Sequence, residues 1–303
     1  MWNMIDDFKI THFGTSPKFI ETCINTKLSP IKTHSLKSLK CIMSTGSPLI
    51  EKCFEYVYEH IKKDVQLCSI SGGTDIISCF ALGNITLPVI SGEIQCLGLG
   101  MDVAAFNDQG EDLFNQKGEL VCKKAFPSMP IYFWNDKDGK KFHDAYFNKY
   151  KDVWHHGDFI EINSHGGVKI FGRSDATLNP GGIRIGTAEI YRVVESFTAI
   201  ADSLVVGKSI DNDERVILFV IIKDGFNFSN QLIKDIKKDI FKKCSPRHVP
   251  QIILETKDIP YTISGKKVEI AVKKIINGSN VNNRDSLKNP ESLDLYKHLK
   301  ELN

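Results

Sequence analysis

The sequence predicts a protein of mixed α/β and α+β class that is organised in two parts. In the first part, short apolar runs alternate with segments of helical periodicity, and from residue 92 onward short alternating strands are separated by Gly, Asn and Asp. In the second part, amphipathic helices alternate with apolar strands. These patterns predict β-α layers with a small β-rich subdomain, followed by a compact α+β domain.

Length and charge narrow the class of protein. The chain has 303 residues and a formal net charge of +2, with 42% hydrophobic and 25% charged residues, as in an ordinary soluble globular protein. We expect neither a nucleic acid nor a membrane as the main partner, because binding to either usually shows as a clustered basic patch. No apolar run is long enough to span a bilayer, and the start MWNMIDDFKI lacks a basic region followed by an apolar core. We therefore expect a cytosolic protein.

The cysteines indicate neither a metal site nor a redox pair. Eight are scattered along the chain, and no two of them form a C-x-x-C pair. Because zinc knuckles and redox dithiols usually carry such a pair, we expect reduced thiols that pack in the core. These residues are Cys23, Cys41, Cys53, Cys68, Cys79, Cys96, Cys122 and Cys244.

A strand, a loop and a helix are predicted between residues 39 and 61. The segment LKCIMSTGSPL begins as an apolar strand and ends in small residues. The following segment is expected to be helical because its apolar residues repeat at helical spacing, namely Ile50, Cys53, Phe54 and Val57. The strands of the β-rich region are predicted at GEIQCLG (92–98), GELVCKK (118–124) and GGVKIFGR (166–173).

The second part is predicted to be an independent module. Residues 187–200 form a helix whose apolar face carries Ile190, Val193, Val194 and Phe197, and a second helix at 229–244 is stopped by Ser245-Pro246. The other predicted elements are strands at 203–207, 215–223 and 251–255 and a last helix at 266–276. The domains are expected at 1–174 and 175–276, followed by a polar tail at 277–303.

Two loops of small residues could approach a phosphate-bearing ligand. STGSPL (44–49) lies between a strand and a helix, where small residues admit a flat ligand and the helix start offers N–H groups to anions. In SGGTDI (71–76), two glycines precede Thr74 and Asp75, whose oxygens suit a phosphate contact and a Mg²⁺ ion. An ordinary turn is the alternative at both places.

The stretch HHGDF (155–159) carries a candidate ribose ligand. Asp158 follows a glycine, and a carboxylate held on a tight turn can accept two ribose hydroxyls. A routine turn residue is the alternative. His155 and His156 have no third metal ligand at a suitable spacing, so we expect them to have other partners or to be exposed.

Two further stretches gather charge around glycines. GRSDATLNPGGIRIGTAEI (172–190) sets Arg173, Asp175 and Arg184 around a Pro-Gly-Gly turn that leads into a helix. In YTISGKKVEI (261–270), Lys266 follows small residues just before a helix, where a point charge can reach a phosphate oxygen. The alternatives are a plain connection in the first stretch and a solvated pair of lysines in the second.

The fixed order of these five motifs resembles the adenylate-forming superfamily, which includes acyl-CoA synthetases, non-ribosomal peptide adenylation domains and luciferases. The resemblance implies that the first part of the chain is the C-terminal portion of a large AMP-binding domain. The implied ligand contacts are Gly46, Ser47 and Pro48 with adenine, Gly73 and Thr74 with the ATP phosphates, Asp158 and Arg173 with the ribose, and Asp75 with Mg²⁺.

The same resemblance implies that the second part is a small mobile domain. Asp175 would be the hinge between the two domains, and Lys266 would be the lysine that promotes adenylation. Arg184 would lie near the α-phosphate, while Gly181 and Gly182 would leave room for the pantetheine arm of CoA.

Longer phrases narrow the resemblance to the acetoacetyl-CoA synthetase family. These phrases are GGTDI (72–76), FPSMPIYFWND (126–136), VWHHGDF (153–159), the stretch 166–192, SPRHVP (245–250) and YTISGKKVE (261–269). The resemblance implies an acid-thiol ligase of ketone-body and lipid metabolism. In such a ligase, acetoacetate reacts with Mg-ATP to give acetoacetyl-AMP and pyrophosphate, and CoA then yields acetoacetyl-CoA and AMP.

This sequence also differs from members of the superfamily in its length. Members of the superfamily are about twice as long, and a phosphate-binding loop rich in Ser, Thr and Gly precedes the region that this sequence matches. We therefore expect the C-terminal half of a ligase, inactive by itself because a sheet interrupted inside the large domain leaves edges and apolar faces uncovered. Two alternatives remain: a non-catalytic remnant that binds nucleotide, CoA or a partner, and a synthetase for another short carboxylic acid.

Overall fold

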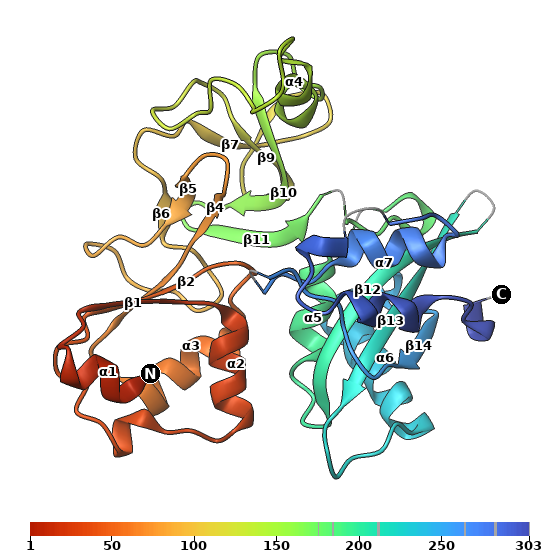
Figure 1. Cartoon of the computed structure of the whole chain (residues 1–303), viewed down its shortest axis with the longest axis horizontal. Helices are drawn as coiled ribbons and strands as arrows, with labels where there is room; N and C mark the ends of the chain where they lie inside the picture. The colour runs from red at the N-terminus through yellow and green to blue at the C-terminus, as the bar shows by residue number, and fades with distance from the viewer. Residues whose placement is uncertain (175, 184, 211–212, 264, 282–283, 303) are drawn as a thin grey trace. The chain divides into compact units, whose positions relative to one another are not determined.

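The chain folds into two compact units, Met1–Ile170 and Phe171–Asn303, in a computed structural model (Figure 1). The structure describes residues 1–174, 176–183, 185–210, 213–263, 265–281 and 284–302. The division between the units lies close to the sequence-based boundary at 174/175. Each unit has its own hydrophobic core and is described by itself.

The first unit begins with a parallel sheet in the order β1-β2-β3, flanked by helices. Its strands are β1 (His12–Thr15), β2 (Cys41–Ser44) and β3 (Gln66–Ser69). Its helices are α1 (Trp2–Asp7), α2 (Pro17–Asn25), η1 (Pro30–Lys32) and α3 (Glu51–Tyr56), which continues as the π-helical turn η2 (Val57–Ile61). The strand, loop and helix predicted between residues 39 and 61 are thereby confirmed.

The rest of the first unit is rich in β-structure, as the sequence predicts. Strands β4 (Ser71–Gly73), β5 (Ser78–Leu82) and β6 (Cys96–Leu97) form one antiparallel sheet. A second sheet has the order β11-β10-β9-β7-β8. Its strands are β7 (Val103–Phe106), β8 (Asp112–Leu113), β9 (Gly118–Cys122), β10 (Trp154–Ile162) and β11 (Val168–Arg173), and helix α4 (Lys140–Tyr146) precedes β10.

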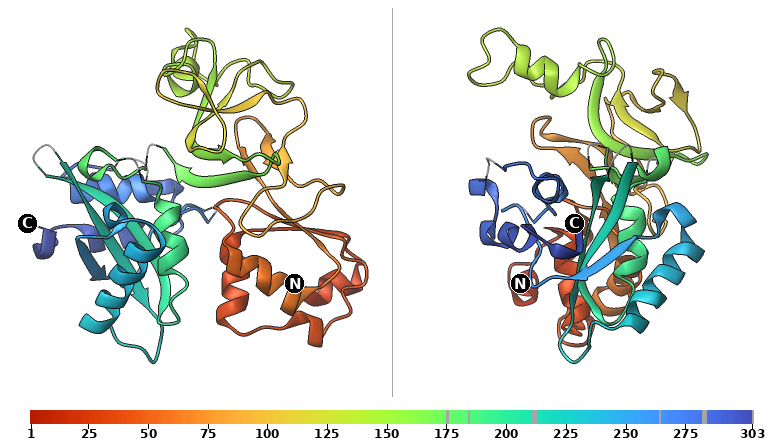
Figure 2. Two further views of the ribbon diagram at one scale, coloured as in Figure 1. Left: turned by 180° about the vertical axis from the view of Figure 1, so that it is seen from behind. Right: turned by 90° about the vertical axis from the view of Figure 1, so that its right-hand side faces the viewer.

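The second unit is a sheet covered by helices on both faces (Figure 2). Its strands are β12 (Ile200–Ile210), β13 (Asp213–Ile222) and β14 (Ile252–Glu255), with β13 antiparallel to β12 and parallel to β14. Its helices are η3 (Pro180–Gly182), α5 (Thr187–Val194), α6 (Asn230–Lys243), η4 (Pro246–His248) and α7 (Glu269–Ile276). The C-terminal segment adds η5 (Arg284–Ser286), η6 (Pro290–Tyr296) and η7 (Lys300–Leu302).

Strand β13 explains why both faces of this sheet are covered. Its central residues are apolar without interruption, so alternate side chains reach opposite faces and both faces must be buried. Val216, Leu218 and Val220 pack with α5 and α6. On the other face, Ile217 and Phe219 pack with α7 and η6.

Several predicted bounds are corrected by tertiary contacts. The helix predicted at 187–200 ends at Val194, because Ile200 already pairs with Ile222 in the sheet. The last helix begins at Glu269 rather than 266, because Lys267 forms a β-bridge with Tyr261. The strand predicted at 92–98 is reduced to Cys96–Leu97, since Gly92 adopts a positive φ of 81°.

The segment expected as a polar tail belongs to the second unit. Leu293 and Tyr296 of η6 are buried in the core beneath α7, where the ring of Tyr296 packs edge-on against Phe219. The few apolar residues of this segment are therefore spaced to cover one face of the domain. No helix in the described ranges is long and apolar enough to cross a membrane.

Candidate functional site

The carboxyl edge of the β1-β2-β3 sheet carries the STGSPL loop. The amide of Ile70 donates to the carbonyl of Ser44 at 2.9 Å, which brings the ends of β2 and β3 together. Gly46 has a φ of +102°, and no heavy atom lies within 4 Å of the position that a Cβ would occupy. Ligands of parallel α/β sheets bind at this edge. Gly46, Ser47 and Pro48 thus lie on an open loop that can admit a flat ligand.

The SGGTDI motif forms the β4-β5 hairpin rather than a plain loop. A Cβ on Gly72 would lie 2.1 Å from the carbonyl oxygen of Ser78, and a Cβ on Gly73 would lie 2.8 Å from Cε1 of His156. The two glycines are therefore required for close packing within the hairpin and against β10. Thr74 and Asp75 follow at the exposed end of β4.

The expectation of a tight turn around Asp158 is wrong. Residues 154–162 form strand β10, and the pairing of β10 with β9 shifts register between His155 and Phe159. Gly157 supplies a positive φ of 81° inside this irregularity, as in a β-bulge. Asp158, with its side chain 14% exposed, lies 3.6 Å from His156 in an Nε2–Oδ2 contact.

Aromatic side chains connect Asp75 with Asp158. The Tyr146 hydroxyl donates to Oδ2 of Asp75, and the Tyr146 ring stacks on Trp154 with centroids 3.6 Å apart. Trp154 Nε1 donates to Nδ1 of His156 at 3.5 Å. We call Asp75, Tyr146, Trp154, His156 and Asp158 the acidic-aromatic cluster.

The sequence predicted both acids of this cluster but not its aromatic members. A signal for two of them was present in the phrase VWHHGDF, which contains Trp154 and His156. Tyr146 had no such signal, because it reaches Asp75 across 71 residues. His155 instead pairs with Glu119 at 3.0 Å, so both histidines have partners. No group of three or more His, Cys, Asp or Glu side chains in the described ranges could hold a metal ion.

In the second unit, Gly181 is exposed and its backbone lies close to the side chain of Arg247. It has φ 58° and ψ 33°, and a Cβ there would lie 2.3 Å from Nη1 of Arg247. Its amide donates to Oδ1 of Asp213 at 2.6 Å. Hydrogen bonds from the amides of Gly181 and Glu214 lower the pKa of Asp213. Gly182 ends the same η3 turn, and Arg173 is the exposed last residue of β11.

Lys266 lies on a short hairpin with its side chain exposed. The amide of Thr262 donates to the carbonyl of Lys266 at 2.8 Å, and the amide of Lys266 donates to Oγ1 of Thr262 at 3.0 Å. An exposed ammonium group is thus attached to a backbone segment with two defined hydrogen bonds. Asp175 and Arg184, the expected hinge and phosphate contact, lie outside the described residues.

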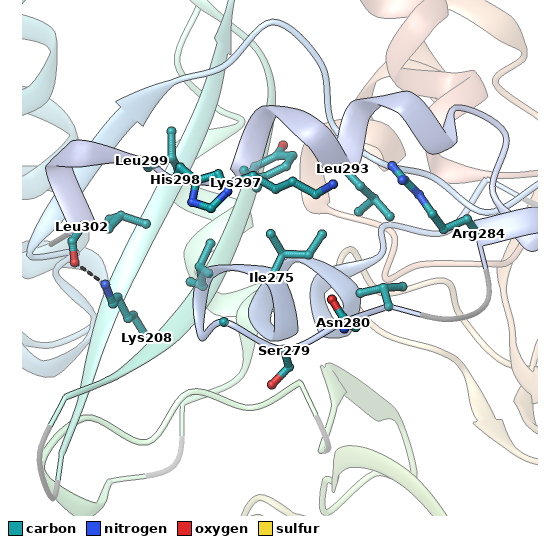
Figure 3. A pocket seen from close by; sticks show the side chains of 14 residues that line it. Lys208, Ile275, Ser279, Asn280, Arg284, Leu293, Lys297, His298, Leu299 and Leu302 are labelled. Atoms are coloured by element: carbon teal, nitrogen blue, oxygen red, sulfur yellow. Dashed lines mark hydrogen bonds between the residues drawn. The ribbon is translucent and has the colours of Figure 1, made fainter.

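The second unit also contains a cavity (Figure 3). It is lined by α7 and the C-terminal segment, with Ile275 and Leu293 on opposite sides. Lys208 donates to the carbonyl of Leu302 at its margin. None of the described candidate residues lines this cavity.

Comparisons with known proteins identify the family. The chain is 52% identical over its whole length to acetoacetyl-CoA synthetase of Xenopus tropicalis, and 53% identical over 96% of its length to acetoacetyl-coenzyme A synthetase of Rhizobium meliloti. The solved acetoacetyl-CoA synthetase from Streptomyces lividans covers 98% of the chain with a TM-score of 0.89 and 39% identity. The chain belongs to the acetoacetyl-CoA synthetase family.

The match to this family concerns part of each member. The chain spans 45% of both curated relatives and 46% of the Streptomyces lividans chain, as a C-terminal half. An anthranilate CoA ligase, AuaEII, solved with anthranoyl-AMP, has the same fold, with a TM-score of 0.73 over 87% of this chain and 21% identity. No protein-family model matches the chain. The fold is thus that of the adenylate-forming acyl-CoA ligases.

Proposed function

We propose that this chain supplies the C-terminal half of an acetoacetate-CoA ligase. The observation that carries the proposal is the 52% identity over the whole chain to a relative named acetoacetyl-CoA synthetase. Two positions expected to bind the nucleotide have suitable surroundings, because Gly46 lies on an open loop and Asp158 is a largely buried carboxylate. The eight free cysteines are consistent with the cytosol, which we propose as the compartment.

The proposed reaction proceeds in two steps. A carboxylate oxygen of acetoacetate bonds to the α-phosphorus of ATP while the bond to the β-phosphate oxygen breaks and pyrophosphate leaves. The sulfur of CoA then bonds to the acyl carbon, AMP leaves, and the thiol proton is released. The first step mainly requires orientation and neutralisation of phosphate charge.

The described residues divide this work between the two units. In the first unit, Gly46, Ser47 and Pro48 hold the adenine, Gly73 and Thr74 the phosphates, and Asp158 the ribose. In the second unit, Lys266 neutralises the charge that develops on the phosphate during adenylation. Arg173 contacts the ribose, and Gly181 and Gly182 leave space for pantetheine. For Arg184 and Asp175, which lie outside the described residues, we propose roles at the α-phosphate and at the hinge.

The oxygens of Thr74 and Asp75 suit a Mg²⁺ ion only when a nucleotide supplies further ligands. Mg²⁺ commonly takes one or two protein carboxylates and completes its coordination with phosphates and water. Asp75 is an exposed carboxylate beside the hydroxyl of Thr74, whereas the described ranges contain no three-ligand cage. Asp75 would therefore hold the ion, which supplies positive charge to the phosphates when bound.

The proposal is tested by ATP–pyrophosphate exchange. We expect the 303-residue chain alone to show little or no exchange, and a chimera with the N-terminal half of the Xenopus tropicalis relative to show exchange that depends on acetoacetate. In the chimera, Lys266→Ala should lower exchange on the order of 100-fold or more, because one charge-stabilising contact is lost. Transfer from preformed acetoacetyl-AMP to CoA should persist.

The controls separate the alternatives. Lys274→Met, at an exposed lysine of α7, should leave exchange unchanged. A folded chimera that binds nucleotide but lacks exchange would favour the non-catalytic remnant. Faster exchange with another short carboxylic acid would indicate that this acid, and not acetoacetate, is the substrate. Equal loss of both half-reactions in Lys266→Ala would contradict the role of that lysine.

A further inference from the structure

Lys267 is a buried cation next to the exposed Lys266. Its side chain is only 16% exposed, and its Nζ lies 3.1 Å from Oδ1 of Asp202 and in contact with Oε1 of Glu195. The same Nζ donates to the carbonyl of Ser203 at 2.6 Å and lies 4.1 Å from the ring centroid of Tyr191. Such complete pairing is what allows a lysine to be buried in charged form.

The partners of Lys267 come from two separate elements, α5 and β12. Glu195 caps the C-terminal end of α5, Tyr191 lies within α5, and Asp202 and Ser203 belong to β12. The partners also bind one another, since the Ser203 hydroxyl donates to Oε1 of Glu195 at 2.9 Å. Lys267 therefore fastens its own segment to the helix and to the sheet at once.

Tyr261 completes the connection from the opposite side of the hairpin. It forms a β-bridge with Lys267, and its hydroxyl donates to Oδ2 of Asp202 at 2.7 Å. Both residues at the base of the hairpin thus bind the same carboxylate. Above this base, the amide of Gly265 donates to the carbonyl of Thr262 at 2.8 Å, and Lys266 follows.

Electrostatics favour a permanently charged Lys267. Burial by itself lowers the pKa of this lysine, but Asp202 and Glu195 outweigh burial and raise the pKa well above its usual value. The ammonium group therefore stays charged at physiological pH and is held by ionic contacts on two sides. Because the Nζ of Lys267 is surrounded by protein groups, its charge attaches the hairpin to α5 and β12 and does not face a ligand.

We propose that Lys267 is a positioning residue, which fixes the hairpin formed by residues 261–263 and 265–267 to α5 and β12 so that Lys266 is presented to the substrate from a rigid base. The proposal rests on the proposed function, because it assigns adenylation to Lys266. It deepens that function by explaining the lysine pair: one member acts on phosphate and the other holds the loop. Orientation of a reacting group requires such support, since a misplacement of about 1 Å can reduce a rate ~100-fold.

Hydrogen–deuterium exchange on the 303-residue chain tests the attachment directly. In Lys267→Met, the amides of Thr262, Gly265 and Lys266 should exchange ~10-fold faster or more, because the hairpin opens locally. Amides of α6 should keep their protection. Lys274→Met, the same substitution at an exposed lysine, should leave the hairpin unchanged.

A triple variant separates positioning from stability. Lys267→Met leaves Glu195 and Asp202 buried without their cation, and this alone lowers stability. Adding Glu195→Gln and Asp202→Asn removes those charges and should raise the melting temperature toward that of the wild type. The hairpin amides should nevertheless continue to exchange faster than in the wild type. Wild-type protection of these amides in the triple variant, or in Lys267→Met, would overturn the proposal.

Half-reactions of the chimera test the consequence for catalysis. Lys267→Met and the triple variant should lower kcat for adenylation ~10- to 100-fold with a smaller change in KM for ATP, and Lys267→Arg should recover part of kcat. Transfer from preformed acetoacetyl-AMP to CoA should persist. Unchanged adenylation, or equal loss of both half-reactions in the triple variant, would refute a positioning role. A wild-type chimera without exchange would refute the proposed function, whereas amide exchange would still decide whether Lys267 holds the hairpin.

Discussion

Two lysines that are adjacent in the sequence, Lys266 and Lys267, lie in opposite environments because of the backbone structure around them. Lys266 is exposed, whereas the side chain of Lys267 is 16% exposed and surrounded by acids. At the base of a β-hairpin, successive side chains point to opposite sides, so one lysine must face the domain when its neighbour faces solvent. The two lysines therefore have different physical roles.

Glu93 provides a prediction about pH at the scale of one residue. It is 8% exposed and binds the turn between β10 and β11, accepting from Asn163 Nδ2 at 2.9 Å and from His165 Nε2 at 2.8 Å. Burial raises the pKa of Glu93, but the hydrogen bonds from His165 and Asn163 and the charges of His165 and Lys169 together outweigh burial, so the net pKa is lowered from 4.5. The ionised carboxylate consequently stabilises the folded state.

Because the folded pKa lies below the unfolded one, this stabilisation is present above pH 4.5 and is lost as pH falls through the folded pKa. Glu93→Gln should lower the free energy of unfolding by about 1–2 kcal/mol at neutral pH, and the difference from wild type should shrink below pH 4.5. Denaturant titrations at several pH values measure this difference in the free energy of unfolding. Glu55→Gln, at an exposed position of α3, is the control. A difference that stays constant down to pH 3 would contradict the prediction.

At the scale of elements, two acids at the start of β13 hold the loop that precedes α5. Glu214 Oε1 accepts from the amide of Asn179 at 2.8 Å, while Asp213 Oδ1 accepts from the amide of Gly181 at 2.6 Å. Glu214 is also paired with Lys273 of α7 at 2.7 Å. The loop with the expected pantetheine glycines is thus fixed to the sheet from one side.

Gly181→Ala should destabilise the second unit. An alanine at φ 58° costs about 1–2 kcal/mol in backbone strain, and its Cβ would also displace Arg247. Thermal unfolding of Gly181→Ala, Arg247→Ala and the double variant separates these effects, because the double variant retains only the backbone strain. If Gly181→Ala melted at the wild-type temperature, the left-handed conformation of this residue would be wrong.

The elements divide into those that the local pattern predicts and those that it does not. Strand β13 and helix α6 are long and strongly periodic, so their positions were predicted nearly to the residue. Strand β10 was missed because His155, His156 and Gly157 break its apolar alternation. Pairing with β9 keeps this segment extended, and the bulge absorbs the residues that break the pattern.

At the scale of the whole molecule, the proposed hinge at Asp175 would let the small domain take a different orientation in each step of the reaction. Asp175→Pro in the chimera should restrict the change between them, since proline fixes its own φ. We expect adenylation to be reduced less than 10-fold and transfer from preformed acetoacetyl-AMP to CoA to be reduced on the order of 100-fold. Separate assays of the two half-reactions measure this. Intact thioester formation would contradict the hinge role of Asp175.

The sequence by itself determined the family, the order of the motifs and the class of the two parts, because these follow from short phrases and from local periodicity. It also identified Asp158, Asp75, Gly46 and Lys266 as candidates. Which residues support them was decided only by the tertiary structure. Tyr146 reaches Asp75 across 71 residues, and Lys267 reaches Glu195 across 72, through the pairing of distant elements. A local pattern reports burial along one element, whereas partners depend on which elements pack together.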